Sequence, residues 1–288
     1  MKVKTYILYF AALAFAIISC SKPVDRIVKS TDGVEISYTV QGEGTPALVF
    51  VHGWSCDKTY WREQVPEFSK NYKVVTIDYG GHGKSGLNRD NFTIESFGDD
   101  VAAVINDLKL DKVILIGHSM GGLVIIDAAT KLPGKVEALI GIDTYERLVD
   151  TTFTRELMDQ LTAPFYTDFA SSAKAFVKSM FPPGADSTLV ETIATDMSSA
   201  PQEVAMQAFT SMFEYGNTKV EANLKALQLP IYAVSTDLWP TDVEGNRKYA
   251  KSFDVKIMKG YGHFLMMENP EMFNRLLQET VDEIISKK

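Results

Sequence analysis

The chain is poor in histidine and cysteine. Only four of its 288 residues are histidine and only two are cysteine. Two cysteines can form at most one disulfide, and none can form within one mature chain if Cys20 is lipidated, because only Cys56 then remains. The formal net charge is −8 and no basic patch is evident, so nucleic acid is not expected as a partner. Internal repeats and low-complexity segments are also lacking in the sequence.

Long apolar runs are scarce too, and the one that stands out lies near the start. It covers 13 residues, from Tyr6 to Ile18, which is short for a membrane span but typical of a signal-peptide core. It ends in Ile-Ile-Ser-Cys, which resembles a bacterial lipobox. We therefore predict a lipoprotein signal peptide over residues 1–19 and lipidation of Cys20, with an ordinary secretory signal as the alternative. Acyl chains on Cys20 would anchor the protein to a membrane of the bacterial cell envelope, on its periplasmic or surface side.

From residue 34 onward, short apolar runs alternate with helical patterns. This alternation predicts an α/β fold, in which helices cover a mostly parallel sheet. The first run is expected to be antiparallel to its neighbour. Helices are expected after Thr93, from Met120 to Lys131, and from about Pro270. The runs expected to form strands are Val34–Val40, Ala47–Val51, Val74–Asp78, Val113–Gly117, Ala138–Asp143, Ile231–Thr236 and Val255–Met258.

The alternation stops between residues 146 and 229. This segment has helical patterns, many phenylalanines and methionines, and no clear strand. We predict a helical lid over residues 146–229, inserted between two parts of one core at residues 20–145 and 230–288. Most of the large apolar side chains should form the lid's own core, and a few should line a pocket beneath it.

The sequence Gly117-His118-Ser119-Met120-Gly121-Gly122 joins a predicted buried strand to a predicted helix. It has the G-x-S-x-G pattern of a nucleophile elbow, in which a tight turn projects the serine hydroxyl. A side chain at Gly117 or Gly121 would clash where strand and helix almost touch. The turn also points the first amides of the helix at whatever Ser119 attacks. Ser119 is therefore the predicted nucleophile.

A serine hydroxyl needs a base within hydrogen-bond reach. His118 should point away from the Ser119 hydroxyl, and His52 and His82 lie in loops at strand ends. His263 lies in Gly-Tyr-Gly-His-Phe, between the last predicted strand and the last predicted helix. That loop opens at the same edge of the sheet as the elbow. We predict that His263 is the base.

Stabilising an oxyanion requires two amides that converge on one point. The Met120 N–H follows the nucleophile at a helix start, and it is the first candidate. The second is the Trp54 N–H in the loop after Val51, where Gly53 lets the backbone pass close to a substrate. These two amides form the predicted oxyanion hole.

Together the motifs resemble those of the α/β-hydrolase family, in its serine-nucleophile branch of esterases, lactonases and haloperoxidase-like enzymes. His52-Gly53-Trp54 is similar to the family's oxyanion motif, and residues 78–85 are similar to its D-x-x-G-H-G-x-S loop. The elbow and the histidine loop complete a resemblance that spans almost all of the chain after the signal segment. It implies an eight-stranded, mostly parallel sheet flanked by helices, a helical cap after the sixth strand, Ser–acid–His order, and neither cofactor nor metal.

The acid departs from the family's pattern. It usually follows the seventh strand in a stretch like G-D-x-D-x-x-x-P, but here that stretch lacks the glycine, and the usual position falls on Trp239 or close to Asp237. A minority of the family places the acid after the sixth strand, where Asp143 stands. The sequence favours Asp237 and leaves Asp143 as the alternative, with Asp242 third.

Serine at position 119 bears on the reaction, because related dehalogenases and epoxide hydrolases have aspartate there. We expect a serine hydrolase that cleaves a carboxylic ester, lactone or thioester through an acyl-enzyme. The apolar lid favours a small-molecule substrate with a hydrophobic part. Alternatives with the same triad are a C–C bond hydrolase, a perhydrolase and a small-peptide aminopeptidase. An alternative of another class is a lipid-anchored binding protein or receptor without catalysis.

Overall fold

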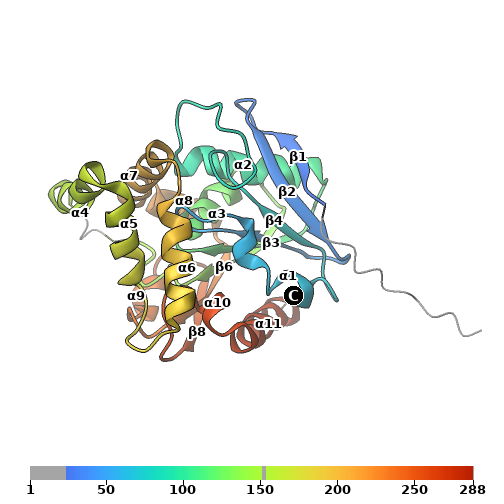
Figure 1. Ribbon diagram of the computed structural model, residues 1–288. Coiled ribbons are helices and arrows are strands. Elements are labelled where there is room, and N and C mark those ends of the chain that lie inside the picture. Colours follow the sequence, from blue (N-terminus) through green and yellow to red (C-terminus); the bar gives the residue numbers. More distant parts are fainter. Residues whose placement is uncertain (1–23, 151–153, 288) are drawn as a thin grey trace, which may run out of the picture.

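An eight-stranded sheet lies at the centre of the protein (Figure 1), in a computed structural model that describes residues 24–150 and 154–287. Its strand order is β1-β2-β4-β3-β5-β6-β7-β8. The pairs β1–β2 and β2–β4 are antiparallel, and every other pair is parallel. The strands are β1 (Arg26–Lys29), β2 (Glu35–Gln41), β3 (Ala47–Val51), β4 (Val74–Ile77), β5 (Val113–His118), β6 (Val136–Ile142), β7 (Pro230–Thr236) and β8 (Ser252–Met258).

The prediction of an eight-stranded, mostly parallel α/β sheet is confirmed. Strands β3 and β5 are buried along their whole length, which explains why they read as continuous apolar runs. Strand β1 was not predicted from the sequence, because it is a four-residue edge strand whose side chains are mostly exposed and carry no apolar alternation. The predicted signal peptide and Cys20 lie outside the described residues.

Helices pack on the sheet from both halves of the chain. The mostly apolar α3 contacts both α2 and α8. Figure 1 shows α1 beside α11, and the Asn274 side chain of α11 donates a hydrogen bond to the Glu63 carbonyl just before α1. The helices of the core are η1 (Lys58–Trp61), α1 (Val65–Phe68), α2 (Ile94–Asp107), α3 (Met120–Thr130), α9 (Val243–Asn246), α10 (Leu265–Glu268) and α11 (Pro270–Ser286).

Five further helices follow one another between β6 and β7, with no strand among the described residues of this segment. Three of them begin at polar caps whose side chains accept backbone hydrogen bonds: Thr154, Asp168 and Asp186. Among the helices of the described residues, none is long and apolar enough to cross a membrane. The five are α4 (Arg155–Thr167), α5 (Phe169–Lys178), α6 (Ser187–Ser198), α7 (Gln202–Thr218) and α8 (Val220–Leu227).

The loop after β4 is held by a buried carboxylate at its first residue, Asp78. Its Oδ1 accepts a hydrogen bond from the Lys58 amide at 2.7 Å, and its Oδ2 accepts one from the Lys84 amide at 3.0 Å. The Lys58 ammonium also pairs with Asp78, and both side chains are at least nine-tenths buried. Gly83 has φ +53, and a Cβ there would lie 2.4 Å from the Asp78 carboxyl carbon. Glycine is therefore needed at position 83 of the D-x-x-G-H-G-x-S segment, because the chain passes close to the carboxylate of a structural ion pair there.

Replacing Asp78 by alanine should destabilise the protein severely, because the buried Lys58 ammonium would lose its closest counter-charge. We expect a loss of about 3 kcal/mol or more in the free energy of unfolding, measured by urea denaturation at pH 7. The matched control is Lys84→Ala, which removes an exposed ammonium but leaves the Lys84 amide in place, and it should change stability little. Equal stability of the Asp78→Ala variant and wild type would contradict this role.

Candidate functional site

Ser119 stands at a strained turn between β5 and α3. Its φ of 53° and ψ of −122° are values that residues with a side chain rarely adopt. A Cβ at Gly117 would lie 2.3 Å from the Gly121 carbonyl oxygen, and a Cβ at Gly121 would lie 2.6 Å from the His52 carbonyl oxygen. The steric reason predicted for these two glycines is confirmed. The Thr144 hydroxyl donates to the Ser119 carbonyl at 2.6 Å, which further fixes the turn.

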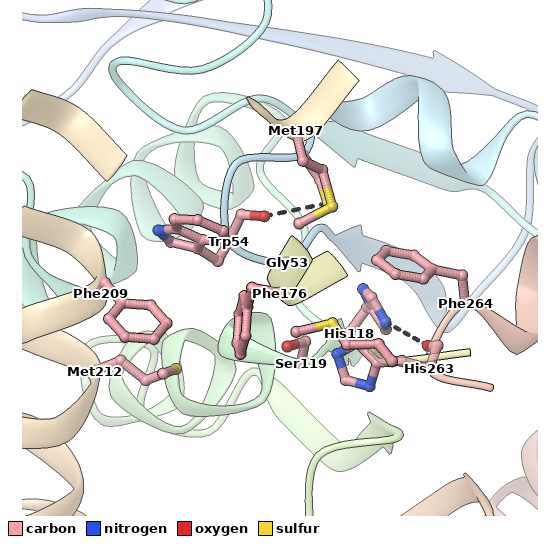
Figure 2. Close-up of a pocket in the computed structure, with 12 residues that line it drawn as sticks. Gly53, Trp54, His118, Ser119, Phe176, Met197, Phe209, Met212, His263 and Phe264 are labelled. Atoms are coloured by element: carbon pink, nitrogen blue, oxygen red, sulfur yellow. Dashed lines mark hydrogen bonds between the residues drawn. The ribbon is translucent and has the colours of Figure 1, made fainter. Parts of the chain in front are cut away.

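His263 reaches the same place from the loop between β8 and α10. Both Ser119 and His263 line a small cavity of about 40 Å³ and a larger one of about 520 Å³. Figure 2 shows the two side chains next to each other, and the His118 ring lies 4.7 Å from the His263 ring between centroids. The His263 amide donates to the Met180 carbonyl, and the His263 carbonyl bonds to His118 Nε2 at 2.8 Å. The backbone on both sides of the imidazole is therefore held.

The carboxylate against His263 is that of Asp143, at the end of β6. Asp143 Oδ2 lies 2.8 Å from His263 Nδ1, and the aspartate is fully buried. Its Oδ1 accepts hydrogen bonds from the Thr236 amide at 2.8 Å and from the Thr236 hydroxyl at 3.1 Å. Asp143 also has a positive φ of 46°. The carboxylate is thus held in one orientation by the end of the neighbouring strand β7.

The sequence preference for Asp237 is therefore corrected. Asp237 is exposed, and its Oδ1 accepts a hydrogen bond from the Gly260 amide at 2.7 Å. Asp242, the third candidate, caps α9 by accepting from the Gly245 amide. Trp239, at the family's usual acid position, packs its ring edge-on against the His263 ring at 5.5 Å. The loop after β7 supports the imidazole from outside instead of supplying its carboxylate.

The loop after β3 lies directly against the elbow. A Cβ at Gly53 would lie 3.2 Å from Ser119 Cβ and 2.9 Å from His118 Nδ1. Trp54 lines the small cavity with Ser119, and Met120 lines the large one with Ser119. The Trp54 indole donates to the Ala205 carbonyl of α7 at 2.7 Å. The two amides predicted as an oxyanion hole thus belong to segments that meet at Ser119.

The other three histidines are buried and uncharged near neutral pH. Burial lowers the pKa of His52 to about 4 and that of His82 to about 3. Burial and the nearby His263 hold the pKa of His118 well below its usual value. His52 Nδ1 bonds to the Gly53 carbonyl and His82 Nδ1 to the Gly80 carbonyl. None of these three rings bonds to an acidic side chain, as His263 does.

The large cavity, which we call the main cavity, is covered mostly by lid side chains. Figure 2 shows Phe176 beside Ser119, with Phe209 and Met212 farther from the serine on the same side. The lid residues in its wall are chiefly apolar: Leu161, Phe165, Phe176, Met180, Phe209, Met212 and Phe213.

Within residues 24–150 and 154–287, no group of three or more His, Cys, Asp or Glu side chains could hold a metal ion.

Glu146 is a residue that the sequence reasoning did not single out. It lines the main cavity together with Ser119, Asp143 and His263. Burial raises the pKa of Glu146 to about 7, and the neighbouring Asp143 carboxylate adds to the shift. The only signal in the sequence was its place three residues after Asp143, in a loop at the edge where the strands end.

Solved structures of similar fold span most of the chain, and a curated relative spans somewhat less of it. The chain is 24% identical over 189 residues to Karrikin insensitive 2 receptor IA of Petunia hybrida. This alignment covers 62% of this chain and 69% of that protein. An esterase from Exiguobacterium antarcticum shares the fold with a TM-score of 0.79 at 20% identity, covering 90% of this chain and 100% of that one. The solved structure of Est816, an N-acyl homoserine lactone degrading enzyme, has a TM-score of 0.76 at 24% identity. The match covers 88% of this chain and 99% of that one.

At these identities the solved structures establish the fold and not the reaction. A family model extends the likeness across the elbow, the lid and the histidine loop, since it matches residues 46–270. The resemblance seen in the sequence motifs is therefore confirmed, and the chain belongs to the α/β hydrolase fold family.

Proposed function

We propose that this protein is a serine hydrolase that cleaves a carboxylic ester, lactone or thioester through an acyl-enzyme on Ser119. The observation that carries the proposal is the hydrogen bond between Asp143 and His263, at cavities that His263 shares with Ser119. The carboxylate lies 2.8 Å from His263 Nδ1, and the serine lines both cavities with the same imidazole. This is the order of groups that activates a serine hydroxyl.

In this mechanism His263 Nε2 takes the Ser119 proton as the oxygen attacks the substrate carbonyl. Asp143 keeps Nδ1 protonated and stabilises the imidazolium. The Trp54 and Met120 amides stabilise the negative charge on the tetrahedral oxygen. The imidazolium then protonates the leaving group, and a water molecule, deprotonated by His263, releases the acid from Ser119. No other group has to supply or remove a proton.

The lid bears on the choice of substrate. A main cavity of about 520 Å³ has room for a small molecule, and its wall of phenylalanine and methionine suits an apolar portion. Serine at position 119 supports an ester-type intermediate, because an acyl group can leave a serine oxygen by attack of water. The same residues could serve a C–C bond hydrolase, a perhydrolase or a small-peptide aminopeptidase, and a receptor role would need none of the chemistry.

Covalent labelling separates an enzyme from a receptor with an inactive site. A fluorophosphonate probe should label the wild-type protein, and Ser119→Ala should abolish the label and lower ester hydrolysis by at least about 10³-fold. Gel fluorescence and a chromogenic short-chain aryl ester provide the two measurements. A folded wild-type protein that takes up no label would rule out the hydrolase.

The acid is tested by comparing Asp143→Asn with Asp237→Asn on the same aryl ester. Asp143→Asn should lower kcat by roughly 10²–10⁴-fold, because an amide favours the wrong imidazole tautomer. Asp237→Asn keeps an oxygen that can accept from the Gly260 amide, so its kcat should stay near the wild-type value. The reverse ranking of the two variants would return the role to Asp237.

We further propose that the protein is a lipoprotein of the bacterial cell envelope, anchored by acyl chains on Cys20. The apolar segment followed by Ile-Ile-Ser-Cys supports this. Such an anchor would hold the hydrolase at a membrane surface, close to apolar substrates.

Metabolic labelling with a clickable fatty acid in a bacterial host tests the anchor. The wild-type protein should incorporate the label and fractionate with membranes, and Cys20→Ala should do neither. Cys56→Ala is the matched control, since Cys56 is buried in the fold and should not affect lipidation. An unlabelled wild-type protein in the soluble fraction would exclude the anchor.

A further inference from the structure

Polar side chains are unevenly distributed around the main cavity. The helical part of the lid contributes mainly apolar side chains to its lining, whereas the segment between β6 and α4 contributes Glu146, Arg147 and Asp150. Of these three residues, Glu146 is the nearest to Asp143 in the sequence. The charges of both Asp143 and His263 also influence its pKa. A carboxyl group that shares a cavity with Ser119, His263 and apolar side chains can orient a substrate.

The Glu146 carboxyl group lacks a full set of partners. Its Oε1 atom is buried and has no hydrogen-bond partner among the described residues. Arg147, the adjacent cation, lies 3.7 Å from Asp150 and forms its ion pair there. Burying an acceptor without a donor costs free energy. A ligand that supplies the donor should therefore gain more binding free energy than it would from an ordinary surface contact.

Hydrogen bonds hold the backbone on both sides of Glu146, which limits the positions that its carboxyl group can take. The Glu146 carbonyl accepts from the Asp242 amide at 2.8 Å. Asn246 bonds on both sides of it, donating to the Tyr145 carbonyl and accepting from the Leu148 amide, each at 2.7 Å. A binding group needs this kind of support to discriminate between substrates.

We propose that Glu146 is a specificity-determining residue that accepts a hydrogen bond from the substrate. The preferred ester, lactone or thioester then carries a donor, either a hydroxyl or an ammonium group, on the part that lies in the main cavity. This inference rests on the proposed hydrolase function and adds a substrate class to it. Substrates without a donor leave the buried Oε1 atom unpaired, and they should react more slowly.

The test uses ester triplets of equal chain length that end in a methyl, a hydroxyl or an ammonium group. One triplet carries the terminal group in the acyl part, and the other carries it in the alcohol part. For wild type, kcat/KM should favour a hydroxyl or an ammonium ester over the methyl ester by roughly 10- to 100-fold in one of the triplets. Because each preference is a ratio within one protein sample, it does not depend on the fraction of active protein.

Two substitutions separate the two donors. Glu146→Leu removes the acceptor and should bring the preference for either donor close to one. Glu146→Gln keeps an acceptor oxygen but loses the charge, so it should retain a preference for hydroxyl and lose a preference for ammonium. Glu43→Leu is the matched control, because Glu43 is exposed in the loop between β2 and β3 and should keep the wild-type ratio.

The possible failures are distinguishable. If the fluorophosphonate probe does not label wild type, the hydrolase proposal fails, and the inference fails with it. If wild type is labelled and cleaves the methyl esters but shows no donor preference in either triplet, only the inference is overturned. A wild-type preference that persists unchanged in labelled Glu146→Leu would also overturn it, because the donor would then be recognised elsewhere.

Discussion

The close approach of β5, α3 and the loop after β3 is the constraint on which the rest of the site depends. A Cβ at Gly117 or Gly121 would lie within 2.6 Å of a backbone oxygen, so the three segments can meet only where side chains are missing. That contact keeps Ser119 at positive φ and leaves little space at Gly53, where a Cβ would lie 3.2 Å from Ser119 Cβ. The position of the candidate nucleophile and the positions of the candidate oxyanion amides therefore depend on the same close contact.

Much of this arrangement could be predicted from the sequence because its signals are local. The elbow, the buried strands and the helix after Thr93 each depend on residues within one short segment. The position of the acid does not, since it depends on how β6 and β7 align. The Asp143 amide bonds to the Val234 carbonyl, and the Thr236 amide bonds back to the carboxylate. No pattern within residues 235–242 could reveal that the neighbouring strand had already supplied the carboxylate.

Burial divides the titratable groups of the site into two kinds. His52, His82 and His118 lie in surroundings that disfavour their charged forms, and they act as neutral packing and hydrogen-bonding rings. Asp143 is equally buried, but it is surrounded by donors from Thr236 and His263. Glu146 lies between these cases, with a pKa of about 7 and one unpaired oxygen. This difference in partners could not be foreseen from residue type, because all of these residues sit at strand ends or in loops.

Trp54 links the lid to the reacting centre. Its indole is bonded to Ala205 of α7 and packs against Phe165, Phe169, Phe176 and Phe209, while its backbone belongs to the loop beside Ser119. A displacement of α7 must therefore either strain that loop or break the indole bond. Through this one side chain, the position of α7 is coupled to the geometry of the loop beside Ser119.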